Sequence, residues 1–437
     1  MWWRLLATAT CGGAVLVLGA DVAPGGSIRA LEPDTCELTP VALNAIEREN
    51  GCLDVSDDAD VGLRPARTIA DAYPIFLGVA VDPDNNRVVM ADSARKGLLM
   101  YDRAGGVSPG AADEVAKPLA DVRGGKTEIG FVASVALDRA RKEKYTVNND
   151  SGDKVVVFDY DATGNVAPKR ALTVTHQAWG LALDRARDEM AITIEINNVI
   201  EIYGRTATGK ARPRRVIKGD KTGLADPHGI AIDADHDEML VTNHGNWTSL
   251  TSFDPDAQPW EKTGAAGEAS ASRSEGRRST AKGGRFLPPS IRVFAGTAQG
   301  DAAPRRVIQG AKTGLNWPMS LDVDAKNDEI AVANSGDNRV LIFRRSDNGN
   351  VAPIRAIGGS HTGLSGPMGV AMDTKNDEMW VTNYGDHTAL VFARTAAGNV
   401  APKRIVRNAP AGTPSVGFGN PGAVAYDSKR DEILVPN

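Results

Sequence analysis

One short pattern recurs along this chain of 437 residues and constrains its fold more than any other feature. Each copy has a run of alternating apolar residues that ends in aspartate, a polar turn, a second apolar run, a turn with Asn and Gly, and a third run. The clearest copy starts with GVAMD at Gly369 and continues through MWVTN to Asn383. Because the apolar residues alternate with a period of two, these segments are predicted strands. The aspartates that end the first strands are Asp82, Asp138, Asp184, Asp233, Asp324, Asp373 and Asp427.

The spacing of these aspartates predicts a ring of small sheets. Successive copies are 56, 46, 49, 91, 49 and 54 residues apart, close to the roughly 40 to 55 residues of a four-stranded blade except where the fourth copy carries an insertion. A fourth short strand follows each complete copy, as in GNVAPKRAL from Gly164, and its proline and paired basic residues suit an outermost edge. We therefore predict an all-β fold, a seven-bladed β-propeller of four-stranded blades, with six blades as the alternative.

The two ends of the repeat region suggest how such a ring closes. Residues 64–69 read as a fourth strand that lacks its first three, whereas residues 422–437 supply a first and a second strand. Joining the N- and C-terminal strands in one blade removes open sheet edges. The propeller is accordingly expected to span residues 64–437.

The residues before the repeats read as a signal peptide over 1–30 and an N-terminal extension with a short helix over 31–63. The apolar stretch from Leu5 to Ala20 follows one positive charge and, at about 16 residues, is shorter than the roughly 20 needed to cross a bilayer. We expect cleavage, no membrane span thereafter, and a secreted or periplasmic protein. Cys36 and Cys52 flank the predicted helix; a disulfide forms if the flanks fold back, and otherwise the thiols are free or pair between molecules.

The repeats resemble a known class of propeller. The elements GVAVD, VVMAD, NSGDNRVLIF and VTN are similar to NHL and YVTN β-propeller repeats, and the resemblance covers residues 64–437. It implies a propeller but not one function, because that class includes extracellular binding and scaffold proteins, lactonases and lyases. Net charge is −5 without a basic stripe, which argues against nucleic acid as a partner. The chain also lacks HExxH, CxxC and phosphate-loop motifs.

A ring of polar residues marks the expected site. The turn between second and third strands faces the mouth of the central channel in such folds, and it begins ten residues after each repeat aspartate. Oxygen ligands there suit Ca²⁺ or another divalent metal, although Asn and Asp also recur simply because they bend tight turns. The positions are Asp92, Asn148, Ile194, which Glu195 follows, Asn243, Asn334, Asn383 and Asn437.

Histidines and aromatic residues are expected at the same mouth. His228 stands where sister copies have Met319 and Met368, His244 follows Asn243, and the segment THQAWG contributes His176 and Trp179. The resemblance to propeller lyases and lactonases implies a metal held by such residues, whereas each histidine taken alone can equally be a turn residue. Trp317, Met319 and Met368 line an apolar pocket or pack at blade junctions.

Residues 247–289 form the largest departure from the repeat and are predicted to be a flexible insertion, because they are rich in Ala, Gly, Ser and mixed charge. The sequence thus leaves two functions open. The first is a non-catalytic binding module, monomeric and without a cofactor, that takes a protein, glycan or small molecule at the channel-mouth face. The alternative is a metal-dependent lactonase or lyase that uses Asp92, Glu195, His228 and His244 at the channel.

Overall fold

The computed structural model describes residues 72–111, 114–149, 151–250 and 281–415, together with two separate pairs of strands. The chain divides into two compact units, one made of Met1–Ile69 with Phe418–Asn437 and the other of Ala70–Gly417. In the first unit β1 (Arg4–Cys11) pairs with β2 (Ala14–Asp21), and β29 (Ala425–Asp427) pairs with β30 (Glu432–Leu434). The predicted N-terminal helix, the two cysteines beside it and the predicted strand at 64–69 lie outside the described residues.

Among the residues described, no helix is both long and apolar enough to cross a membrane.

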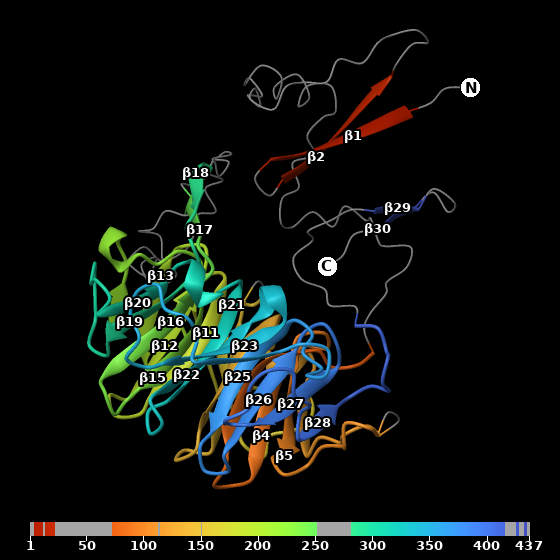
Figure 1. Ribbon diagram of the computed structural model, residues 1–437, viewed down its shortest axis with the longest axis vertical. Coiled ribbons are helices and arrows are strands. Elements are labelled where there is room, and N and C mark those ends of the chain that lie inside the picture. Colours follow the sequence, from red (N-terminus) through yellow and green to blue (C-terminus); the bar gives the residue numbers. More distant parts are fainter. Residues whose placement is uncertain are drawn as a thin grey trace. The chain divides into compact units, whose positions relative to one another are not determined.

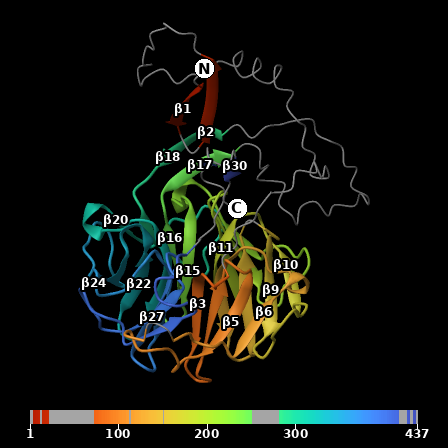
Figure 2. The same ribbon diagram turned by 90° about the vertical axis from the view of Figure 1, so that its right-hand side faces the viewer.

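The second unit contains six antiparallel sheets of four strands each, in addition to a two-stranded hairpin (Figures 1 and 2). Blades 1 to 3 contain β3 (Phe76–Asp82), β4 (Arg87–Asp92), β5 (Gly97–Asp102) and β6 (Ala120–Arg123); β7 (Val132–Asp138), β8 (Glu143–Asn148), β9 (Lys154–Asp159) and β10 (Arg170–Thr173); and β11 (Ala178–Asp184), β12 (Glu189–Ile194), β13 (Val199–Gly204) and β14 (Arg215–Ile217). Blades 4 to 6 contain β15 (Pro227–Asp233), β16 (Glu238–Asn243), β19 (Ser290–Ala295) and β20 (Arg306–Gln309); β21 (Pro318–Asp324), β22 (Glu329–Asn334), β23 (Arg339–Arg344) and β24 (Arg355–Gly358); and β25 (Pro367–Asp373), β26 (Glu378–Asn383), β27 (Thr388–Ala393) and β28 (Arg404–Arg407). These sheets form a β-propeller.

The prediction of seven blades closed by joining the terminal strands is wrong, and the six-bladed alternative is the one observed. Blade 6 packs directly against blade 1, because Thr382 Oγ1 donates a hydrogen bond of 2.5 Å to the Leu77 carbonyl. A Cβ atom added to Gly369 would lie only 2.5 Å from that same carbonyl oxygen. Such close approach leaves no space for a blade between them, so the seventh copy of the repeat is not part of the ring.

A loop of blade 1 closes the ring in place of a shared blade. At the other joints, the outer strand of one blade forms a parallel bridge to a turn glycine of the next, as Ile217 does to Gly300. At the joint between blades 6 and 1, Val107 instead forms an antiparallel bridge to Ile405 in β28. The Val107 N–H donates to the Ile405 carbonyl at 2.7 Å, and the Ile405 N–H donates back at 3.0 Å. Because Val107 is also buried with Ile405, this joint has both backbone and apolar contacts.

One histidine of blade 6 lies close to both ends of the ring-forming segment. His387 Nδ1 lies 2.9 Å from the carbonyl oxygen of Pro74, and its Nε2 lies 3.2 Å from that of Pro414. The side chain is almost completely buried. The chain therefore enters and leaves the propeller at the same place.

Small residues allow the innermost strands to meet around the axis. A Cβ atom added to Gly180 would lie 2.2 Å from the His228 carbonyl oxygen, and one added to Gly229 would lie 2.6 Å from Ser320 Cα. Threonines on the second strands lock neighbouring blades, since Thr193 Oγ1 donates to the His228 carbonyl at 2.5 Å. The apolar core lies between adjacent sheets, and the strand ends of the innermost ring surround the mouth of a central cavity.

The predicted insertion at 247–289 begins and ends in a described hairpin. Strand β17 (Asn246–Leu250) pairs antiparallel with β18 (Ala281–Phe286), and the two project from blade 4 (Figure 1). Residues 251–280 lie outside the described residues. The hairpin follows β16 after only two residues, so it starts at the same end of the blade as His244.

Candidate functional site

The asparagines of the predicted polar ring connect each blade to the linker before it. Asn334 Oδ1 accepts a hydrogen bond from the Asn316 N–H at 2.8 Å, and its Nδ2 donates to the Gly314 carbonyl at 3.0 Å. Asn148, Asn243 and Asn383 accept the corresponding N–H bond from their own linkers, and all of these side chains are buried. Their amide oxygens are therefore occupied by backbone N–H groups, and Asn437 lies outside the described residues.

The remaining members of the ring depart from the asparagine pattern. Asp92 accepts from the Ile75 N–H at 3.1 Å and from Arg95 Nε at 2.7 Å, and burial raises its pKa above the ordinary value in spite of that cation. Ile194 is completely buried. Glu195, which follows it, is the member that reaches the other candidate residues.

Glu195, His228 and His244 come together at the ends of blades 3 and 4. His228 stands near the start of β15, and His244 follows directly after β16. Because these two strands pair antiparallel, the two side chains emerge at the same end of blade 4. Their rings are stacked, with centroids 3.6 Å apart and planes 21° apart. His228 Nε2 lies 3.4 Å from Glu195 Oε1, and both imidazoles are buried. The structure thus assembles three of the residues that the sequence singled out.

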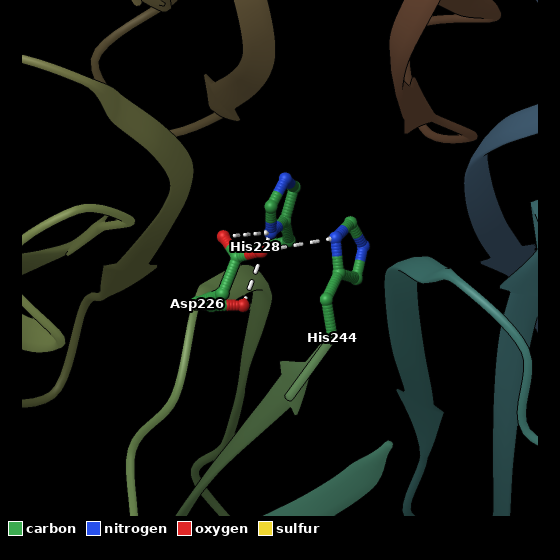
Figure 3. A group of neighbouring side chains, drawn as sticks. All are labelled: Asp226, His228 and His244. Carbon is green, nitrogen blue, oxygen red and sulfur yellow. Dashed lines mark hydrogen bonds and ion pairs between the residues drawn. The ribbon is translucent and has the colours of Figure 1, made fainter. Parts of the chain in front are cut away.

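Asp226 completes this cluster and was not predicted. Its carboxylate Oδ1 lies 3.4 Å from His228 Nδ1, and its Oδ2 lies 3.6 Å from His244 Nδ1 (Figure 3). The Asn246 amide donates to Oδ2 at 2.9 Å, and Asn198 Oδ1 accepts from the Asp226 N–H at 2.8 Å. Burial alone would raise the pKa of Asp226, but the two imidazoles and the Asn246 amide lower it below its ordinary value.

The signal for Asp226 in the sequence is its position directly before the first strand of blade 4. Trp317 and Gly366 occupy the equivalent position in the next two blades, so an aspartate there is a departure from the repeat. All three residues have a positive φ, which is 56° at Asp226. That conformation turns the linker into the strand. The side chain is thereby placed beside His228, two residues further on.

Burial sets the protonation of His228. Removal from water lowers its pKa to about 3, with a further contribution from the adjacent His244, while the Asp226 carboxylate acts in the opposite direction. His228 is therefore neutral at pH 7 and has one N–H and one free electron pair. A neutral imidazole in this state is able to ligate a metal. Ligand atoms of Asp226, His228 and His244 all lie within 4.8 Å of one another.

A row of rings extends from this cluster across four blades. Phe131 contacts Trp179 with centroids 6.4 Å apart, Trp179 contacts His228 at 4.7 Å, and His244 contacts Trp317 at 4.9 Å. The two tryptophans therefore flank the stacked histidines. Trp317 remains 55% exposed, so it is a surface residue at the channel mouth, whereas Met319 is buried.

The other predicted residues lie elsewhere. His176 is partly exposed, and its Nδ1 lies 2.9 Å from Asp153 Oδ1. Asp92 belongs to blade 1 and is bonded to Ile75 and Arg95, whereas Glu195, His228 and His244 belong to blades 3 and 4. The structure thus brings together three of the four residues proposed for catalysis, Glu195, His228 and His244, and it places Asp92 elsewhere.

The fold and the cluster define the chain as a six-bladed β-propeller with a histidine–carboxylate group at its channel mouth. No family model matches the sequence, and no curated protein matches it. Among solved structures, a chain of the nidogen/laminin complex matches with 16% identity and a TM-score of 0.42, over 74% of this chain and 89% of that one. A chain of Kuenenia stuttgartiensis hydrazine synthase matches with 12% identity and a TM-score of 0.47, over 76% and 99%. The resemblance to NHL and YVTN repeats remains a prediction.

Proposed function

We propose that this protein is an exported binding module that captures a protein partner at the channel mouth of blades 4 and 5, beside the hairpin β17–β18. The observation that carries the proposal is the exposure of two large aromatic side chains there. Trp317 is 55% exposed and Phe286, at the end of β18, is 86% exposed. Exposed aromatic residues are the commonest anchors of protein interfaces, because their burial removes much apolar surface from water.

The backbone at Trp317 supports a role in binding. Its φ is 50°, a left-handed conformation that is unfavourable for a bulky residue, while Gly366 occupies the equivalent place in blade 6 without that cost. Blade 5 thus retains a large, exposed side chain on a strained backbone, at a position where glycine suits the fold. Strain of this kind concentrates at functional positions.

The charges beside the aromatic row indicate what kind of partner surface fits. Glu195 places a carboxylate next to His228, whose ring contacts Trp179. Aromatic faces next to carboxylates attract cations. We therefore expect the partner to insert a basic side chain, most suitably arginine, among apolar contacts.

We infer that the module acts outside the cytoplasm and that its repeats belong with the NHL and YVTN class. The apolar N-terminal stretch supports the first inference and the GVAVD and VTN elements support the second. Neither inference is needed for the binding surface itself.

A second candidate function is a metal-dependent lactonase or lyase. One observation favours it: Glu195 lies beside His228 in a buried group that also contains Asp226 and His244. A metal there would act as a Lewis acid, and a carboxylate at its side is suited to move a proton. This candidate requires a metal ion bound by that group.

The binding proposal is tested with a double variant, Trp317→Ala with Phe286→Ser, used as bait against extracytoplasmic proteins of the source organism. The matched control is Leu119→Ser in blade 1, which removes an apolar side chain of the same 55% exposure away from the mouth. We expect wild type and control to retain the same partner and the double variant to bind the purified partner at least about 30-fold more weakly, which is the effect of losing a single anchor of roughly 2 kcal/mol. Equal retention by all three proteins contradicts the proposal.

A further inference from the structure

We propose that Asp226, His228 and His244 form a binding site for one transition-metal ion of the Zn²⁺ type at the rim of the channel (Figure 3). Imidazole nitrogen with carboxylate oxygen is a donor set that Zn²⁺ prefers, whereas Ca²⁺ prefers oxygen alone. The site lies within one blade and does not depend on the partner proposed above.

His244 supplies the first argument, because it is buried without a hydrogen bond. Its side chain is 2% exposed, and neither Nδ1 nor Nε2 has a hydrogen-bond partner. A buried polar group left in this state is costly, and native proteins usually satisfy it with water, an ion or a ligand. Asp226 Oδ2 lies 3.6 Å from Nδ1, which is close but too far for a hydrogen bond.

His228 supplies the second argument, because its surroundings contain too many acceptors. Nε2 faces Glu195 Oε1 at 3.4 Å, while Nδ1 faces the Asp226 carbonyl at 3.2 Å and Oδ1 at 3.4 Å. A neutral imidazole has one N–H, so if Nε2 donates to Glu195 the electron pair of Nδ1 points at oxygen atoms. A cation between Nδ1 and the carboxylate removes this conflict. Glu195 then orients the ring from its far side, as carboxylates commonly do behind zinc-bound histidines.

The charge balance of the cluster supplies the third argument. Within the described part of the chain, Asp226 forms no ion pair with lysine or arginine, and its neighbours are the two histidines and the amides of Asn198 and Asn246. A largely buried carboxylate normally has a cationic partner. A divalent ion would supply the missing charge.

The geometry defines what binding must change. Ligand atoms on one Zn²⁺ at about 2.0 to 2.2 Å each lie within about 4.4 Å of one another, and those of the cluster are within 4.8 Å. An imidazole coordinates in the plane of its ring, whereas the two rings now lie face to face at 3.6 Å. Loading the site therefore requires the rings to turn apart about their side-chain torsions while β15 and β16 hold the backbone. Since Trp179 and Trp317 contact these rings, tryptophan fluorescence should report the change.

The test is titration of the tag-free full chain, stripped with chelator, with Zn²⁺ by calorimetry and with Co²⁺ by absorption spectroscopy. The variants are His244→Gln and Asp226→Asn, and the matched control is His361→Gln, a histidine at an exposed position in the linker before blade 6. We expect one Zn²⁺ per chain, visible bands of tetrahedral Co²⁺, and a change in tryptophan fluorescence. Each variant should weaken Zn²⁺ binding by more than the roughly 10- to 100-fold typical of losing an outer-shell partner, and the control should leave it unchanged.

Two results would overturn the proposal: a wild-type chain that binds no Zn²⁺, or a folded His244→Gln chain that binds it as tightly as wild type. Circular dichroism of metal-free samples establishes that each variant is folded, and Asp226→Asn, which keeps the size of the side chain, decides the question if the histidine variant unfolds. The double variant Trp317→Ala with Phe286→Ser should still bind Zn²⁺. Loss of partner capture and loss of metal are thereby distinguished.

Discussion

At the scale of single residues, the arginine that begins β20 has a different role from the edge protection that the sequence suggested. Arg306 reaches back across blade 4 to Glu238, with Nη1 and Nη2 at 2.6 and 2.7 Å from its two carboxylate oxygens. The residue types were visible in the sequence, but the partner stands two strands away on another part of the repeat. Pairing of this kind depends on strand order and register, which the sequence does not contain.

Glu201 is a second residue whose role depends on packing. It occupies a position in β13 where blades 5 and 6 have Leu341 and Leu390, and it is fully buried. Thr175 Oγ1 donates to its Oε1 at 2.6 Å and the Tyr203 hydroxyl donates to its Oε2 at 2.8 Å. Burial raises the pKa of Glu201 to about 7 in spite of these hydrogen bonds.

This shift predicts a loss of stability with rising pH. In the unfolded chain Glu201 releases its proton near pH 4.5, whereas in the folded chain it keeps the proton until about pH 7, so the folded state binds more protons between these values. The free energy of unfolding should fall across that window by about 3 kcal/mol at most. Glu201→Gln mimics the protonated acid and should remove this part of the slope. Urea unfolding of both proteins at pH 5 and pH 8 measures it, and equal pH dependence would contradict the assignment.

At the scale of elements, the sequence predicted strands well and their assembly less well. The first strand of each ring blade ends at its predicted aspartate, and apolar alternation is sufficient to place the second and third strands. The hairpin β17–β18 was not predicted, because alanine, glycine and serine carry little strand preference. The short fourth strands are paired as predicted on the outer edge of each sheet.

The close approach of innermost strands predicts that Gly229→Ala destabilises the propeller. The added Cβ would lie 2.6 Å from Ser320 Cα and 2.8 Å from the Met319 carbonyl oxygen, and these backbone atoms cannot move aside as a flexible side chain does. We expect a loss of about 1 to 3 kcal/mol in the free energy of unfolding, the usual cost of overpacking. Gly110→Ala is the control, because no atom lies within 4 Å of its added Cβ. Chemical denaturation measures the free energy of unfolding of both variants. Equal stability of the two would contradict the prediction.

At the scale of the whole molecule, counting repeat copies gave the wrong number of blades. The seventh copy has the sequence of a first strand, but the ring is already complete where blade 6 meets blade 1. Contacts of Gly369 and Thr382 with the Leu77 carbonyl hold these two blades in direct contact. The sequence placed Glu195, His228 and His244 on a common face, and the structure brings these three side chains together; that they form a functional site stays a prediction. Asp226 was missed because its contribution depends on a backbone angle and on strand pairing between Pro227 and Asn243.

Closure by the blade 1 loop predicts that a chain ending at Gly417 keeps its propeller intact. Residues Phe418–Asn437 belong to the other compact unit, so their removal should shift the melting temperature by no more than about 2 °C. Val107→Asp in the full chain is the contrasting variant, because it buries an unpaired charge at the closing joint and should cost about 3 kcal/mol or more. Calorimetry of the two proteins compares them. A truncated chain that melts far below the full one would show that closure needs the seventh copy.

The position of His387 has a consequence for everything attached to the propeller. Pro74 and Pro414 are 340 positions apart in the sequence, yet the carbonyl oxygens of both lie within 3.2 Å of the His387 imidazole. Segments tethered at one point experience each other at an effective concentration far above that of free molecules. The propeller therefore fixes the points where the chain enters and leaves it beside each other. Segments attached at Pro74 and at Pro414 start from neighbouring positions.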